Sequence, residues 1–88
     1  MEELLRQLGI DAEPVKGENG SYNIDIEDSN EYGKYFSKLD KSGIVEEEQD
    51  ASSVNFENSS IQFTNEQYTL TLLADFENDT YSLNIREN

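Results

Sequence analysis

The segment YTLTLLADFENDTYSLNI, residues 68–85, decides the fold. Apolar and polar side chains alternate along residues 68–76 and again along residues 81–85, which is typical of half-buried strands. The turn between them is short, so the two strands should pair antiparallel. The residues predicted to face the core are Tyr68, Leu70, Leu72, Ala74, Phe76, Tyr81, Leu83 and Ile85.

The chain before this hairpin is also patterned as strand, back to Gly43. SVNF (residues 53–56) and SIQFT (residues 60–64) alternate around a turn at Glu57-Asn58, and IVEEE (residues 44–48) begins a further strand. Short turns between successive strands predict an antiparallel meander. Such a sheet buries one face and leaves the other in water.

The first half of the chain predicts two helices and a hairpin. Glu2–Leu8 carries one leucine stripe and is followed by Gly9, a residue suited to the position just after a helix. Residues 13–27 predict a hairpin, with turn chemistry in GENG (residues 17–20) and strict alternation in SYNIDIE (residues 21–27).

The second helix is predicted within residues 28–43. Ser29 or Asn30 is the expected N-cap, Gly43 the terminator, and the apolar face is Tyr32, Tyr35, Phe36 and Leu39. Gly33 inside this helix should cost about 1 kcal/mol relative to alanine, and would allow another element to pack closely.

Helix, hairpin, helix and meander together predict an α+β fold. We expect an antiparallel sheet, made of the hairpin and the C-terminal meander, with one or two short helices packed on one face. The chain has 88 residues, no internal repeat and no linker composition, so residues 1–88 should form a single domain.

Charge is the extreme feature of the composition. Twenty Asp and Glu face six Lys and Arg, a net charge of −14, and no basic residue lies between Lys41 and Arg86. Residues 42–85 carry nine carboxylates. This balance repels nucleic acids and anionic membranes, so neither is an expected partner, and it attracts basic protein surfaces.

Several kinds of chemistry lack their usual residues. The chain has no cysteine and no histidine, and it contains no G-x-S-x-G, Walker A or G-x-G-x-x-G motif. We therefore expect no enzyme, no cofactor and no metal centre. No apolar run is long enough to cross a membrane and no signal peptide is visible, so the expected location is the cytoplasm.

Three other interpretations remain open at this point. A weak calcium-binding module would use the side-chain oxygens of DFENDT (residues 75–80). The other candidate segment, DSNEYG (residues 28–33), lacks the later ligands of an EF-hand loop. An adaptor module would pair through a sheet edge, either SVNF or SIQFT. The acidity would otherwise serve solubility alone.

The favoured interpretation is a carboxylate surface that contacts a basic partner. Asp25 and Glu27, two residues apart on a strand, lie about 6.7 Å from each other. One DNA strand carries a charge about every 3.4 Å, so rows of carboxylates on strands and turns can approximate the charge density of a phosphate backbone. Aromatic anchors would have to supply the affinity, and Tyr32 is the candidate if any aromatic side chain is free of the core. The expected contacts are Asp25, Glu27, Glu46, Glu47, Glu48, Asp50 and a second cluster at Asp75, Glu77 and Asp79.

The chain is small, lacks Cys, His and Trp, and contains three acidic segments. These segments are IVEEEQD (residues 44–50), DIEDSNE (residues 25–31) and DFENDT (residues 75–80). In these features it resembles the small acidic inhibitors made by phages, such as anti-CRISPR proteins and uracil-DNA glycosylase inhibitors. The resemblance implies a non-enzymatic DNA mimic that inhibits a nucleic-acid-processing enzyme, for instance a CRISPR nuclease. It transfers no functional residue and leaves the oligomeric state open.

Overall fold

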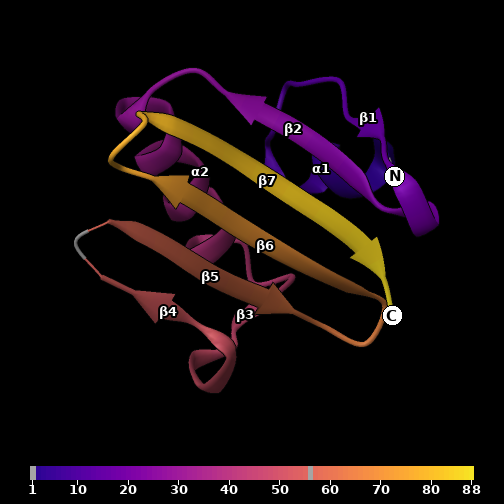
Figure 1. The fold of residues 1–88 in the computed structure, drawn as a ribbon. Coiled ribbons are helices and arrows are strands. Elements are labelled where there is room, and N and C mark those ends of the chain that lie inside the picture. Colours follow the sequence, from indigo (N-terminus) through magenta and orange to yellow (C-terminus); the bar gives the residue numbers. More distant parts are fainter. Residues whose placement is uncertain (1, 56) are drawn as a thin grey trace.

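The computed structural model describes residues 2–55 and 57–88, apart from the side chains of Asn19 and Ala51. Strands and helices alternate along the first half of the chain, and the second half is strand (Figure 1). The elements are α1 Glu2–Leu8, β1 Val15–Lys16, the 3-10 turn η1 Glu18–Gly20, β2 Tyr22–Ile26, α2 Ser29–Lys41, β3 Glu46–Glu47, the 3-10 turn η2 Gln49–Ala51, β4 Ser53–Val54, β5 Asn58–Thr64, β6 Tyr68–Asp75 and β7 Thr80–Glu87.

The strands form one antiparallel sheet in the order β1-β2-β7-β6-β5-β3, with β4 also paired to β5. Its centre is the predicted hairpin, in which β6 and β7 pair from Tyr68 opposite Glu87 to Asp75 opposite Thr80. The N-terminal hairpin joins this meander because β2 pairs with β7. The α+β fold with an antiparallel sheet is therefore confirmed.

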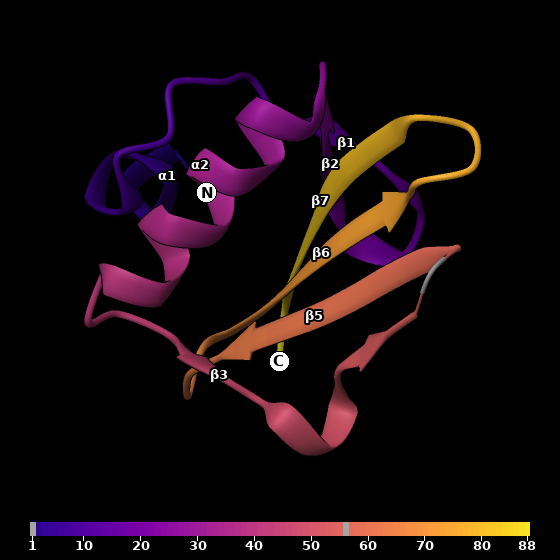
Figure 2. The same ribbon diagram turned by 90° about the vertical axis from the view of Figure 1, so that its left-hand side faces the viewer.

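Both helices cover the same face of the sheet, and no described segment forms a layer on the opposite face (Figure 2). The alternation along β6 assigns residues to these faces, since Leu72 is fully buried whereas Leu73 is 41% exposed. The fully buried side chains include Leu39 of α2 together with Phe63, Leu70, Leu83 and Ile85 of the sheet. The core thus lies between the helices and the inner sheet face.

Helix α1 ends as its sequence predicts. Gly9 has a φ of 76°, and the amides of Gly9 and Ile10 donate to the carbonyls of Arg6 and Leu5. This pair of hydrogen bonds is the Schellman arrangement, which favours glycine because a side chain is strained at positive φ. Leu4, Leu5 and Leu8 are buried, so packing on the sheet holds this short helix in place.

Helix α2 begins one or two residues earlier than expected. Its N-cap is Asp28 rather than Ser29 or Asn30, because the Asp28 carboxylate accepts a hydrogen bond from the Glu31 amide at 2.9 Å. A Cβ on Gly33 would meet no atom within 4 Å. The expected close approach at Gly33 is therefore wrong, and the residue lies on the exposed side of the helix.

Two other expectations are corrected. Phe76 does not continue the core face of β6, because the strand ends at Asp75 and Phe76 is 42% exposed in the following turn. SIQFT is not a sheet edge, because β5 pairs with β6 on one side and with β3 and β4 on the other. Within SVNF, Ser53 and Val54 do form an edge strand, and Phe56 lies outside the described residues.

Among the described residues, neither helix has the length and apolar character that a membrane crossing requires.

Candidate functional site

The nine predicted contact residues form two groups at different borders of the sheet. The first group, here called the acidic end, lies where β2 finishes and β6 turns into β7, at the left in Figure 1. The second group, here called the acidic edge, lies on β3 and η2 beyond β5. The acidic end is Asp25, Glu27, Asp75, Glu77 and Asp79, and the acidic edge is Glu46, Glu47, Glu48 and Asp50.

The acidic end is assembled by the pairing of β2 with β7. Asp25 stands opposite Ser82, and the last pair of this ladder, Ile26 with Tyr81, brings Glu27 to the start of β7. Asp75 stands opposite Thr80 on the other side of β7. Asp25 and Asp75 line one shallow hollow of about 360 Å³ on the open sheet face. Residues far apart in the sequence therefore share one surface.

The turn from β6 to β7 holds the Asp75 carboxylate in place. Its two oxygens accept from the backbone amide of Asn78 at 3.2 Å and from the side-chain amide of Asn78 at 2.7 Å. These hydrogen bonds, the side-chain one first, lower the pKa of Asp75 below its usual value. The turn therefore presents Asp75 as a fixed negative charge.

Asp79 is held from the other side of the same turn. The Tyr81 hydroxyl donates to its carboxylate at 2.9 Å, and Asp79 has a φ of 53°, a conformation that aspartate tolerates. The hydrogen bond to Asp79 is the main cause that raises the pKa of Tyr81, followed by burial. Both flanking carboxylates of the turn are thus oriented by bonds within the protein.

An aromatic stack connects this turn to the core. Phe76 lies edge to face against Tyr81, with ring centroids 6.2 Å apart, and Tyr81 lies 5.5 Å from Tyr32 of α2. Tyr32 is half-buried, and its hydroxyl is 3.1 Å from the Ser59 hydroxyl. Tyr32, the candidate for a free aromatic side chain, is therefore the wrong one, because Phe76 is the exposed member of the stack.

Two further acidic residues lie near the acidic end. Asp28 contributes a negative charge near Tyr81, and the carbonyl of Glu57 accepts from the Phe76 amide at 2.9 Å, which brings Glu57 beside the turn. Asp28 carried a signal in the sequence, since D-S-N-E has the spacing of an N-cap followed by a glutamate. Glu57 carried none, because its position depends on the packing of two separate turns.

The acidic edge is attached more lightly. Glu46 and Glu47 pair with Thr64 and Phe63, and the Glu48 amide donates to the Gln62 carbonyl at 2.8 Å. Ser52 closes the loop, since its hydroxyl donates to the Glu48 carbonyl and accepts from the Gln62 amide. The four acidic side chains are exposed, and none of them is held by a hydrogen bond or ion pair to another described residue.

The open face of the sheet between the two groups is mainly uncharged. Across β5, β6, β7 and β2, one row of facing residues reads Gln62, Thr71, Asn84 and Asn23. The Asn84 amide donates to the Asn23 side chain at 2.9 Å. Carboxylates are thus concentrated at the borders of this face, and its centre carries amides, hydroxyls and the exposed Leu73.

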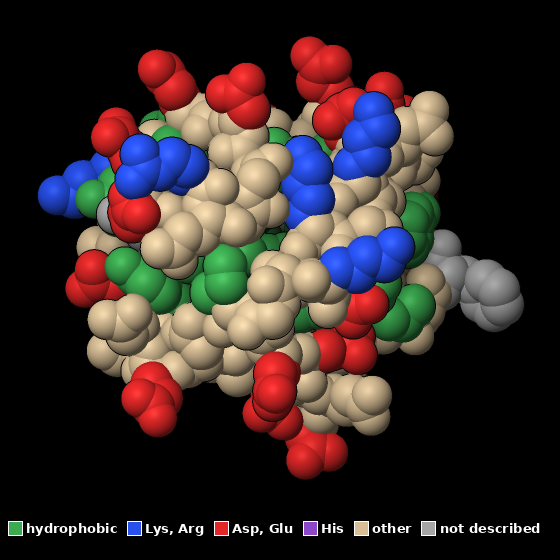
Figure 3. All heavy atoms as spheres, turned by 180° about the vertical axis from the view of Figure 1, so that it is seen from behind, with side chains coloured by type: hydrophobic (Ala, Val, Ile, Leu, Met, Phe, Trp, Pro, Cys, Tyr) green, Lys and Arg blue, Asp and Glu red, His purple; other side chains and the backbone are tan. Residues whose placement is uncertain are grey.

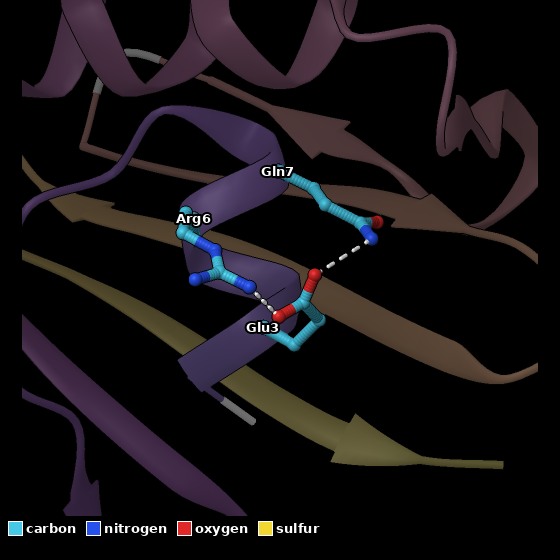
Figure 4. A network of polar contacts seen from close by, with 3 residues as sticks. All are labelled: Glu3, Arg6 and Gln7. Carbon is cyan, nitrogen blue, oxygen red and sulfur yellow. Dashed lines mark hydrogen bonds and ion pairs between the residues drawn. The ribbon is translucent and has the colours of Figure 1, made fainter.

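Basic side chains lie mostly on the opposite side. Lys34, Lys38 and Lys41 belong to α2 and Arg6 to α1, and Figure 3 shows blue side chains across this helical face. Arg6 pairs with Glu3 on the same helix, and Gln7 donates to that carboxylate at 3.4 Å (Figure 4). Lys34 pairs with Glu31 at 3.2 Å. On the open face of the paired strands, the described basic residue is Arg86.

The chemistry of the acidic end is that of fixed charge. Within residues 2–55 and 57–88, no three acidic side chains converge on a position that would hold a metal ion. Asp75 and Asp79 are turned toward Asn78 and Tyr81 instead of toward a common centre. A carboxylate whose pKa is lowered stays ionised, which suits attraction of a cation and is the opposite of what a general acid needs.

Comparisons of the chain with protein-family models, with curated proteins and with solved structures find no match.

Proposed function

We propose that this protein is a non-enzymatic inhibitor that binds a basic, nucleic-acid-binding surface of a target protein, as a DNA mimic. A nuclease of the CRISPR type is the favoured class of target. The acidic end is the proposed contact surface, and the acidic edge adds long-range attraction. Binding would take place in the cytoplasm, where such enzymes act.

The observation that carries this proposal is the uneven distribution of charge. The sheet carries both the acidic end and the acidic edge, and its open face has a single described arginine. Most lysines lie on the helices. Such an asymmetry orients the molecule in the field of a basic partner and raises the association rate. The fixed carboxylates of Asp75 and Asp79 support contact at the acidic end in particular.

Pairing through a sheet edge is less well supported. The outermost strands of the sheet are β1, β3 and β4, and each of them has two residues. Edges this short are a device by which proteins avoid strand addition. We therefore favour electrostatic binding over the adaptor interpretation.

The test uses the immobilised protein, a bacterial lysate, and duplex DNA as competitor. The basic proteins retained at low salt should be released by high salt and also by excess DNA, because DNA competes for the same surface. Retention that neither salt nor DNA reverses would contradict the proposal, as would failure to retain any DNA-displaced protein.

Matched variants assign the contact to one region. Neutralising the acidic end without disturbing its turn (Asp25→Asn, Glu27→Gln, Glu77→Gln) should abolish most of this retention. Neutralising the acidic edge by the same number of charges (Glu46→Gln, Glu47→Gln, Glu48→Gln) should mainly slow association. The reverse pattern would place the contact on the acidic edge and overturn the assignment.

A further inference from the structure

Phe76 is an apolar ring kept at the surface in acidic surroundings. It is 42% exposed, although the seven other aromatic residues of the described chain are buried or half-buried, namely Tyr22, Tyr32, Tyr35, Phe36, Phe63, Tyr68 and Tyr81. Its immediate neighbours in the turn are Asp75 and Glu77, with Asp79 three residues on. The ring therefore combines apolar and π surface with nearby negative charge.

The ring is also held in position before any partner arrives. Tyr81 supports it edge to face, and the Phe76 amide is bound to the Glu57 carbonyl at 2.9 Å. Asn78 and Tyr81 orient the carboxylates of Asp75 and Asp79 on either side. A group held in this way loses little conformational entropy on binding, which favours affinity.

We propose that Phe76 is the anchor of the interface and receives an arginine side chain of the partner's basic surface, with Asp75 and Glu77 as the neighbouring carboxylates. This inference rests on the proposed function and names the contact that supplies its specificity. A guanidinium is planar, weakly hydrated and able to stack on an aromatic face while it binds carboxylates. An ammonium is compact and strongly hydrated, so lysine fits the same place less well.

The experiment compares an oligo-arginine with an oligo-lysine peptide of equal length, titrated into the full-length protein at low salt. We expect the wild type to bind oligo-arginine more tightly. Phe76→Ala and Phe76→Leu should each weaken oligo-arginine binding about two- to fivefold, with a smaller effect on oligo-lysine. Phe76→Leu keeps apolar bulk at the site and removes the π face, so it separates stacking from apolar contact.

Val15→Ala is the matched control, since Val15 is an exposed apolar residue on β1, away from the turn. It should bind both peptides as the wild type does. Circular dichroism of each variant confirms that the fold is retained, and shifts of the Phe76 ring resonances on adding oligo-arginine report direct contact.

The outcomes separate the two proposals. Binding of both peptides that falls with salt but is unchanged in Phe76→Ala and Phe76→Leu overturns the anchor and leaves the proposed function standing. An equal loss for both peptides also overturns the arginine assignment. Absence of salt-sensitive binding overturns the proposed function itself. If Phe76→Ala instead converts a dimer into a monomer in sedimentation, the ring serves a second copy of the chain and the anchor proposal is wrong.

Discussion

The acidic end surrounds a packed aromatic stack, whereas the acidic edge carries its carboxylates on a two-residue strand and one 3-10 turn. Both regions attract cations at long range, because attraction at a distance depends on net charge and little on geometry. They differ in how their side chains are held, since the acidic end has carboxylates fixed by hydrogen bonds and an exposed ring, whereas the acidic edge has neither. Two regions with similar numbers of carboxylates can therefore differ in how firmly the fold orients those carboxylates.

The largest expected effect comes from removing the centre of the aromatic stack. Tyr81 is 8% exposed and contacts both Phe76 and Tyr32, so Tyr81→Ala should lower the free energy of unfolding by about 3–5 kcal/mol. Glu47→Ala on the acidic edge is exposed and should change it by less than about 0.5 kcal/mol. Urea unfolding followed by circular dichroism measures both. Equal effects would mean that the acidic end is no better anchored than the edge.

The sequence predicted the central hairpin because alternation along residues 68–85 determines which side chains face the core. Leu72 and Leu73 are adjacent and chemically identical, yet the period of two assigned one to the core and the other to the surface. The same rule failed at Phe76. Alternation holds only while the strand continues, and the hydrogen bonds from Asn78 to Asp75 begin the turn there.

The grouping of acidic residues could not be predicted, because it depends on the pairing of distant strands. Asp25 and Glu27 lie near Asp75 only because β2 pairs with β7. The alternation of side chains within a strand does not specify which other strand it pairs with. The N-cap was ambiguous for a local reason. Asp28, Ser29 and Asn30 are all good N-caps, and the choice depends on where the chain leaves β2.

A smaller effect on the free energy of unfolding is expected from the hydrogen bonds that connect the acidic edge to β5. The Ser52 hydroxyl bridges the Glu48 carbonyl and the Gln62 amide at 3.0 and 3.1 Å. Ser52→Ala leaves both groups without this partner, and should cost about 1–2 kcal/mol. Hydrogen exchange should accelerate in residues 46–51 while residues 75–80 stay protected.

The control for this variant is the neighbouring exposed residue. Ser53→Ala should change the free energy of unfolding by less than about 0.5 kcal/mol. If Ser52→Ala accelerates exchange equally in both regions, the edge and the end unfold together, and the distinction between a lightly attached and a firmly attached region is wrong.

The smallest effect concerns the titration of Tyr81. Its pKa is raised above the ordinary value of 10.0, chiefly by the hydrogen bond to Asp79. The folded state therefore holds this proton more tightly than the unfolded chain does. The resulting stability is complete below about pH 10 and is lost as the pH rises through the folded-state pKa.

Asp79→Asn keeps a hydrogen-bond acceptor at a position where asparagine tolerates positive φ, and it removes the charge. The pKa of Tyr81 should fall toward its ordinary value, and the loss of stability at alkaline pH should shrink. Carbon chemical shifts of the five tyrosine rings across a pH titration resolve Tyr81 from the others. Glu77→Gln removes the same charge from the same turn without touching that hydrogen bond, so it should move the pKa of Tyr81 much less. Equal shifts of the Tyr81 pKa in the two variants would show that this pKa depends only on the net negative charge nearby. The Asp79 carboxylate would then be no better oriented than the carboxylates of the acidic edge.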